Sequence, residues 1–181
     1  NHNRLQRPAV MDDLKLENGK YIVFTLNRKA LIADKENLGN MIYAMNKAAG
    51  NTPIIAVLRN NAKEVVSQLT ANMADINIID SLPYLEFGYL TAHAMGIITD
   101  SGNVAEEATF NNLPCITLNS YTEHIETVKQ GSNILVGEDA DKLEAAIKDM
   151  TGNNWKKCSL PDRWDGRTAE RIVHILLNMP G

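Results

Sequence analysis

The sequence has little cysteine, no surplus of basic residues and no long apolar run. Its two cysteines, Cys115 and Cys158, lack the CxxC spacing and the histidine cluster of a zinc site, so we expect no metal and two thiols without a chemical role in a reducing cytoplasm. The net charge of -4 argues against a nucleic-acid partner, because phosphate binding needs clustered lysine and arginine. No apolar run approaches the roughly 20 residues that cross a bilayer, so we expect no membrane partner.

The chain also lacks an initiator methionine, and its first residues, NHNRLQRPAV, are polar and resemble no secretory signal. We expect it to be a processed product or an excised piece of something longer. The 181 residues, of which 44% are apolar, suffice for one domain with a sizeable core. Residues 1–20 read as a tail or linker with room for one turn of helix, and residues 21–181 as an α/β domain.

Short apolar runs alternate with stretches of helical spacing along the rest of the chain. The pattern predicts strands at 21–25, 53–58, 76–79, 96–99, 115–118 and 134–136, and helices at 34–49, 61–72, 83–94, 103–111, 123–130, 140–150 and 167–178. This alternation is typical of a parallel sheet with helices on both faces. Ligands of such sheets bind beyond the carboxyl ends of the strands, near the point where strand order reverses.

One corner at such a strand end has the features of a phosphate site. Thr99-Asp100-Ser101-Gly102 follows a predicted buried strand and precedes a helix expected from Asn103. The first amides of a helix lack intrahelical partners and carry partial positive charge, so a diphosphate is a natural guest there. Ser101 adds a hydroxyl, Gly102 permits close approach, and Glu107, about one turn along, is placed to reach the hydroxyls of a ribose.

A purely structural role for the same acids is also open. Asn103 is a good N-cap, and Glu106 three residues later completes a pair that resembles a capping box. Acids in a first helical turn are favoured by the helix dipole alone. Local spacing therefore favours a capping role for Glu106 and leaves Glu107 open between the two roles.

The segment from Thr99 to Gly137 is similar to the signature region of the UDP-N-acetylglucosamine 2-epimerase family. That family has a strand, TDSGG, two residues, EEA, a lone proline before the next strand, T-E-R-P-E, and a Gly-x-x-x-Leu-Val-Gly closing. The positions in register here are Thr99, Asp100, Ser101, Gly102, Glu106, Glu107, Ala108, Pro114, Thr122, Glu123, Glu126, Gly131, Leu135, Val136 and Gly137. SLPYLEF at 81–87 and DGRTAERIVHIL at 165–176 also resemble family elements, so the similarity runs from about residue 21 to 177.

The resemblance implies a Rossmann-like three-layer domain, the C-terminal half of a GT-B fold, with the N-terminal domain absent. That half holds UDP in the family: Ser101 and Gly102 would meet the phosphates, Glu107 the ribose, and Tyr84 and Phe87 would flank the uracil. The catalytic acids and bases belong mainly to the other half. The resemblance further implies no cofactor, a homodimer in full-length form, and a cytoplasmic, bacterial enzyme of cell-surface polysaccharide biosynthesis.

The sequence departs from the family in motifs expected to face the ligand. Where the family has T-x-H-R-x-E-N, residues 25–31 read TLNRKAL, so Arg28 matches while Asn27 replaces the histidine and Ala30-Leu31 replace the Glu-Asn pair. Asn103 replaces the second glycine of TDSGG, and His124 replaces the arginine of T-E-R-P-E, so that a fixed cation becomes a titratable one. Asn27, Arg28, Asn103 and His124 are accordingly expected substrate-binding residues.

The resemblance implies a defined reaction with open alternatives. In the family a base removes the proton from sugar C2, UDP leaves from C1, and UDP adds back after the face is switched, or water adds instead in hydrolysing members. The departures are compatible with another nucleotide sugar, a hydrolysing variant or a paralogue without activity. A GT-B glycosyltransferase and a non-catalytic nucleotide-sugar binder are the alternative functions.

Several polar and aromatic side chains elsewhere in the chain have simpler interpretations. We expect His93 to be packed and His174 to lie on the surface of the closing helix. Trp155 and Trp164 are expected to pack against the sheet edge, and the pair Lys156-Lys157 to form a solvated turn.

Overall fold

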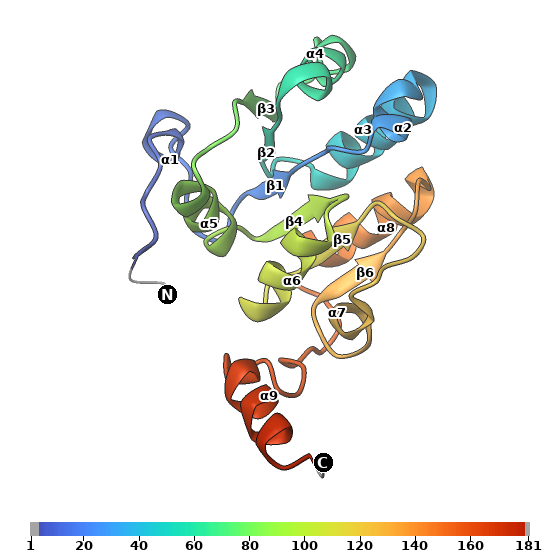
Figure 1. Cartoon of the computed structure of the whole chain (residues 1–181). Coiled ribbons are helices and arrows are strands. Elements are labelled where there is room, and N and C mark those ends of the chain that lie inside the picture. Colours follow the sequence, from blue (N-terminus) through green and yellow to red (C-terminus); the bar gives the residue numbers. More distant parts are fainter. Residues whose placement is uncertain (1–3, 180–181) are drawn as a thin grey trace.

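The sheet of this protein is parallel throughout, and its strands follow the order β3-β2-β1-β4-β5-β6 in the computed structural model, which describes residues 4–179 (Figure 1). Within these residues its six strands are β1 (Ile22–Phe24), β2 (Ile54–Val57), β3 (Ile76–Ile79), β4 (Gly96–Thr99), β5 (Cys115–Thr117) and β6 (Asn133–Leu135). Val23 of β1 pairs with Ile55 on one side and with Ile97 on the other. Strand order therefore reverses between β1 and β4, which confirms the predicted architecture and locates its switch point.

The helices alternate with the strands as the sequence predicts. They are α1 (Val10–Asp13), α2 (Lys29–Ala33), α3 (Lys35–Ala49), α4 (Asn60–Leu69), α5 (Tyr84–Ala92), α6 (Gly102–Phe110), α7 (Ile125–Lys129), α8 (Ala140–Thr151) and α9 (Thr168–Leu177). Asp34 caps α3 by accepting from the N–H of Asn37 at 3.1 Å. The five-residue α2 was not predicted, because so short a segment shows no periodicity. The predicted tail and domain include residues 1–3 and 180–181, which lie outside the described residues.

Alternate strand residues bury opposite faces of the sheet. Phe24, Ile54 and Ile98 belong to a core that α2, α3, α4 and α8 cover. Val23 and Ile55 face the other way, toward α1 and α5, and Ile97 packs there against α6. This period of two is what a strand covered on both faces requires, and it produces the continuous apolar runs in the sequence.

The last helix, α9, stands apart from this body (Figure 1). It follows a long connection, and in the described part of the chain none of its residues is buried. Its apolar side chains are 52–80% exposed, namely Ile172, Val173, Ile175, Leu176 and Leu177. The helix predicted at 167–178 is therefore present, but within residues 4–179 its apolar face is left largely exposed.

The connection to α9 carries one correction. Trp155 packs on the core and donates its indole N–H to Ser132 O at 2.8 Å, next to the edge strand β6, as predicted. Lys156 was predicted to lie in a solvated turn, and that is wrong. Its half-buried ammonium donates to Val128 O and to Asn133 O, each at 2.6 Å, and desolvation lowers its pKa. Lys156 thus ties the connection to α7 and β6, while Lys157 is exposed.

None of the helices within residues 4–179 combines the length and the apolar composition that a membrane span needs.

Candidate functional site

The candidate site lies where strand order reverses. A cavity of about 490 Å³ opens beyond the carboxyl ends of β1, β4 and β5. Its lining comes from three loops and includes five of the predicted site residues with five others: Asn27, Arg28, Asp100, Ser101, Gly102, Asn119, Tyr121, Thr122, Glu123 and His124. An open parallel sheet places its ligands at this position, since the loops on either side of the switch point diverge there.

The floor of the cavity is braced by side chains that follow β1 and β4. The hydroxyls of Thr25 and Thr99 lie 2.7 Å apart, both residues buried. Asp100 accepts from the backbone N–H of Asn27 at 2.8 Å and of Arg28 at 2.5 Å. These bonds fasten the loop after β1 to the loop after β4, so Asp100 acts as a structural brace, a role that sequence reasoning did not assign.

Arg28 is held at the rim of the cavity by partners far away in the sequence. Its guanidinium donates to Asn119 Oδ1 at 2.8 Å and forms an ion pair with Glu138. Asn119 in turn donates to Asp100 O at 3.1 Å. Within the described residues, Arg28 Nε and Asp100 Oδ1 are buried atoms without a hydrogen-bond partner. Such unsatisfied atoms at a cavity wall are typical of a site that a ligand or water completes.

The start of α6 corrects the capping interpretation. The helix begins at Gly102, so Ser101 is its N-cap, and Asn103 is an exposed residue of the first turn outside the cavity lining. In the part of the chain that the structure describes, Ser101 makes no side-chain capping bond. Glu106 does not form a capping box either. The first amides of α6 are therefore left for a ligand beside the cavity.

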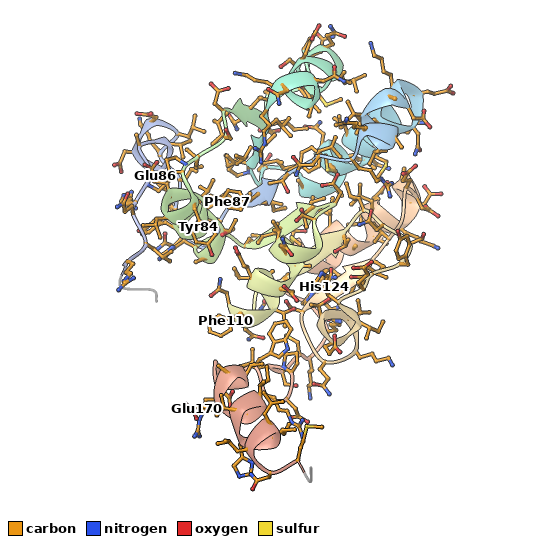
Figure 2. The ribbon with its side chains drawn as sticks, in the orientation of Figure 1. Tyr84, Glu86, Phe87, Phe110, His124 and Glu170 are labelled. Atoms are coloured by element: carbon orange, nitrogen blue, oxygen red, sulfur yellow. The ribbon has the colours of Figure 1, made fainter. Side chains whose placement is uncertain are left out.

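Glu106 instead pairs with His124 across the cavity rim. Glu106 Oε1 lies 2.6 Å from His124 Nδ1. The other edge of the imidazole lies against Gly102, where an added Cβ would stand 2.8 Å from Nε2 and 2.5 Å from Cδ2. In this structure the absence of a side chain at Gly102 therefore lets the His124 ring approach the helix start closely. Figure 2 shows His124, which belongs to the loop before α7, close to α6.

Glu107 points to another partner, on α5. Its Oε1 accepts from the Tyr84 hydroxyl at 3.2 Å, and the carboxylate raises the pKa of Tyr84 through its charge and this bond. Tyr84 and Phe87 also line a second cavity, of about 320 Å³, together with Val57 and Leu82. Asn27 and Ser101 line both cavities, so two compartments adjoin at the switch point. Tyr84 and Phe87 lie on the same side of the sheet in Figure 2.

Two of the departures from the expected motif lie in α2. Leu31 is fully buried in the core beside α3. Ala30 is exposed and carries no polar group. Neither side chain can take the place of a glutamate or an asparagine toward a ligand, whereas Asn27 lines both cavities.

The two other histidines within the described residues, His93 and His174, conform to their predicted surroundings. His93 Nδ1 lies 2.9 Å from Tyr89 O, and its ring stacks on that of Tyr89 with centroids 4.1 Å apart. His174 is an exposed residue of α9.

Comparison with known proteins relates this chain to one family. A family model described as UDP-N-acetylglucosamine 2-epimerase matches residues 1–177. The UDP-N-acetylglucosamine 2-epimerase of Methanocaldococcus jannaschii is 36% identical over 167 residues, which are 86% of this chain and 44% of that protein. A homolog of that enzyme from Methanococcus maripaludis is 32% identical over 176 residues, 94% of this chain and 48% of that protein. The chain spans about half the length of the curated relatives it matches.

Solved structures give the same result. The Methanocaldococcus jannaschii enzyme in complex with UDP-GlcNAc and UDP superposes with a TM-score of 0.70 at 36% identity, over 87% of this chain and 45% of that one. An Escherichia coli heptosyltransferase has a TM-score of 0.55 at 14% identity, over 82% of this chain and 45% of that one, and supports the fold alone.

Proposed function

The chain belongs to the UDP-N-acetylglucosamine 2-epimerase family, and we propose that it is the half of such an enzyme that holds the UDP of the substrate. One observation carries the proposal: the uncapped start of α6 meets a polar cavity at the switch point, with Glu107 one turn along the helix. The diphosphate would accept from the first amides of α6 and from the Ser101 hydroxyl. Glu107 would accept from the ribose hydroxyls, oriented by Tyr84.

The adjoining cavity is suited to the uracil ring. Tyr84 and Phe87 supply aromatic rings, and Val57 and Leu82 supply apolar contacts. Ser101 borders both compartments, so one nucleotide would span them with its phosphates near α6. A relative that is 36% identical over 87% of this chain is described in complex with UDP-GlcNAc and UDP, which supports this assignment.

The exposed apolar face of α9 supports a domain arrangement in which residues 21–181 are one half of a two-domain enzyme. An isolated helix of ten residues is marginal in water, and most helical stability comes from packing an apolar face. The relatives are about twice as long as this chain, so the other half is a suitable cover for Ile172, Ile175 and Leu176. The substrate would lie between the halves, and the base for sugar C2 would come from the other one. A homodimer of the two-domain enzyme is part of the same proposal.

In the whole enzyme this half would stabilise the leaving group. UDP departs from C1 as the C2 proton is removed, and negative charge grows on the diphosphate while the C–O bond breaks. Oriented amides and nearby cations at a closed site stabilise such charge without reorganising. The product would be UDP-N-acetylmannosamine, or free N-acetylmannosamine in a hydrolysing enzyme. Such donors are consumed by cytoplasmic enzymes that build cell-surface polysaccharides.

A non-catalytic nucleotide-sugar binder is the second candidate. It is favoured by α2, where buried Leu31 and Ala30 replace two polar residues of the family motif, and by Asn27, which cannot carry charge. Ala30 and Leu31 line neither cavity, and Asn27 still offers a neutral amide to both, so this candidate predicts UDP binding without turnover.

Calorimetric titration with UDP tests the binding assignment on this chain. Glu107→Ala should weaken binding by about 1–3 kcal/mol, the scale of a hydrogen bond to a charged group. Glu64→Ala is the matched control, because it removes an exposed carboxylate from a different helix, α4. Equal UDP affinity in wild type and Glu107→Ala would contradict the ribose assignment.

Hydrogen exchange at sugar C2 tests the reaction. A protein that joins this chain to its other half should incorporate deuterium from heavy water into UDP-N-acetylglucosamine without an acceptor. Binding of UDP without exchange would favour the non-catalytic candidate, and turnover only with an acceptor would favour a glycosyltransferase.

A further inference from the structure

His124 has a conformation that makes its charge decisive for the ligand. We infer that His124 binds the diphosphate of a nucleotide sugar as an imidazolium, so that ligand binding is linked to the uptake of up to one proton. The inference rests on the proposed function, because it assumes that the diphosphate sits at the start of α6. His124 stands where the family motif has an arginine. An arginine keeps its charge at every pH, so it cannot couple ligand binding to a proton as a histidine can.

The imidazole is fixed on both of its edges. Nδ1 lies 2.6 Å from the Glu106 carboxylate, which can only accept, so Nδ1 carries hydrogen in either charge state. The backbone is held as well: the His124 N–H donates to Thr122 Oγ1 at 3.0 Å, and His124 O accepts from Thr127 Oγ1 at 2.7 Å. Nε2 is therefore left at Gly102, next to the first amides of α6.

The protonation state of Nε2 then determines whether a phosphate is attracted or repelled. In neutral His124 the bare Nε2 is an acceptor, and it would face phosphate oxygens that are acceptors too. In the imidazolium the same atom donates a charge-assisted hydrogen bond. A bound diphosphate places negative charge beside Nε2, which favours the protonated ring in the complex. Anion and proton should therefore bind together.

Among the basic groups that the structure describes around the cavity, His124 is the one that can gain a proton when the diphosphate binds. Among the described residues that line the cavity, the basic side chains are Arg28 and His124, and Arg28 is already paired with Glu138. Acidic groups come from α6 as Glu106 and from the loop after β4 as Asp100. The further titratable groups of the His124 loop and of α7 are Tyr121, Glu123, Glu126 and Lys129. A dianionic ligand adds to this negative charge, so proton uptake compensates part of it.

Calorimetry with UDP-N-acetylglucosamine tests the inference on this chain. The diphosphate of this probe is esterified at both ends and keeps its charge from about pH 5 to about pH 8, the range in which histidines change charge. Wild-type affinity should fall by up to about tenfold per pH unit toward the alkaline side, the limit for one linked proton. Binding enthalpies in buffers of different ionisation enthalpy should show uptake of up to one proton.

Two arginine variants isolate His124. His124→Arg carries a permanent cation, so its affinity should be independent of pH across this range, without proton uptake. His174→Arg, the same change on exposed α9, should keep the wild-type pH dependence. A flat wild-type profile, or an equal slope in His124→Arg, would overturn the inference while leaving UDP binding intact. Failure of wild type and His124→Arg to bind the probe at any pH would instead contradict the proposed function and, with it, this inference.

Discussion

Replacing Gly102 with alanine should weaken UDP binding while leaving the fold about as stable as before. An ideal Cβ at this position stands 2.5 Å from His124 Cδ2 and 2.8 Å from Nε2. Since carbon atoms pack at about 3.5–4.0 Å, the ring must move by about 1 Å. That movement breaks the 2.6 Å contact between His124 Nδ1 and Glu106 and carries Nε2 away from the start of α6.

The two consequences differ in size. For folding, the His124–Glu106 pair is 31% and 39% exposed, which limits its contribution to about 1 kcal/mol. Alanine in a helix recovers about 0.4–1 kcal/mol of chain entropy, so the terms nearly cancel. For binding, the variant loses a hydrogen bond between charged groups, about 1.5–3 kcal/mol. UDP affinity should therefore fall by about tenfold to about a hundredfold.

Urea unfolding and UDP calorimetry measure the two quantities separately. Gly39→Ala is the matched control, because its Cβ would lie 3.6 Å from Leu69 Cδ2, an ordinary contact in the middle of α3. This control should gain about 0.5–1 kcal/mol of stability and keep its UDP affinity. Wild-type UDP affinity in Gly102→Ala would refute the reasoning, because the diphosphate would then not depend on the start of α6.

Three further outcomes are expected. Glu107→Gln should lower the pKa of Tyr84, because the Glu107 carboxylate raises that pKa, and ultraviolet titration of tyrosinate measures the change. The hydrogen bond between Tyr84 and Glu107 is present at neutral pH and is lost as the pH rises through the raised pKa of Tyr84. Gly131→Ala should cost about 2 kcal/mol or more in urea unfolding, since its Cβ would lie 2.5 Å from Thr109 Cγ2 and 2.7 Å from a backbone oxygen. Native Cys115 should resist alkylation, checked by mass spectrometry, because burial raises its pKa to about 12. An unshifted tyrosine titration, an undiminished stability or labelling of folded Cys115 would contradict the respective expectation.

The architecture was predictable because its signals are local. Runs such as Ile54–Val57 and Gly96–Thr99 are apolar throughout, as strands covered on both faces must be, and the helices between them have regular spacing. The alternation of strands and helices predicted a ligand at the carboxyl ends of the strands, and the Thr99–Gly102 corner indicated which end, but the strand order itself was not predicted. The short α2 was missed because five residues do not complete a recognisable period.

The partners within the site were not predictable from spacing. Asp100 bonds to amides 72 and 73 residues away, and Arg28 reaches Asn119 at a separation of 91 residues. Glu106 was assigned to a cap because a carboxylate three residues after Asn103 fits that motif, and nothing local reveals His124 opposite it. Such pairings depend on which loops the sheet order brings together, so they appear only once the strands are ordered.

The most direct test of the central claim is a crystal structure of this chain with UDP. We expect the diphosphate to accept from the N–H groups at the start of α6, Glu107 to accept from the ribose, and the uracil to lie beside Phe87. UDP bound away from the end of β4, or phosphates that leave the amides of Gly102 and Asn103 without a contact, would contradict the central claim.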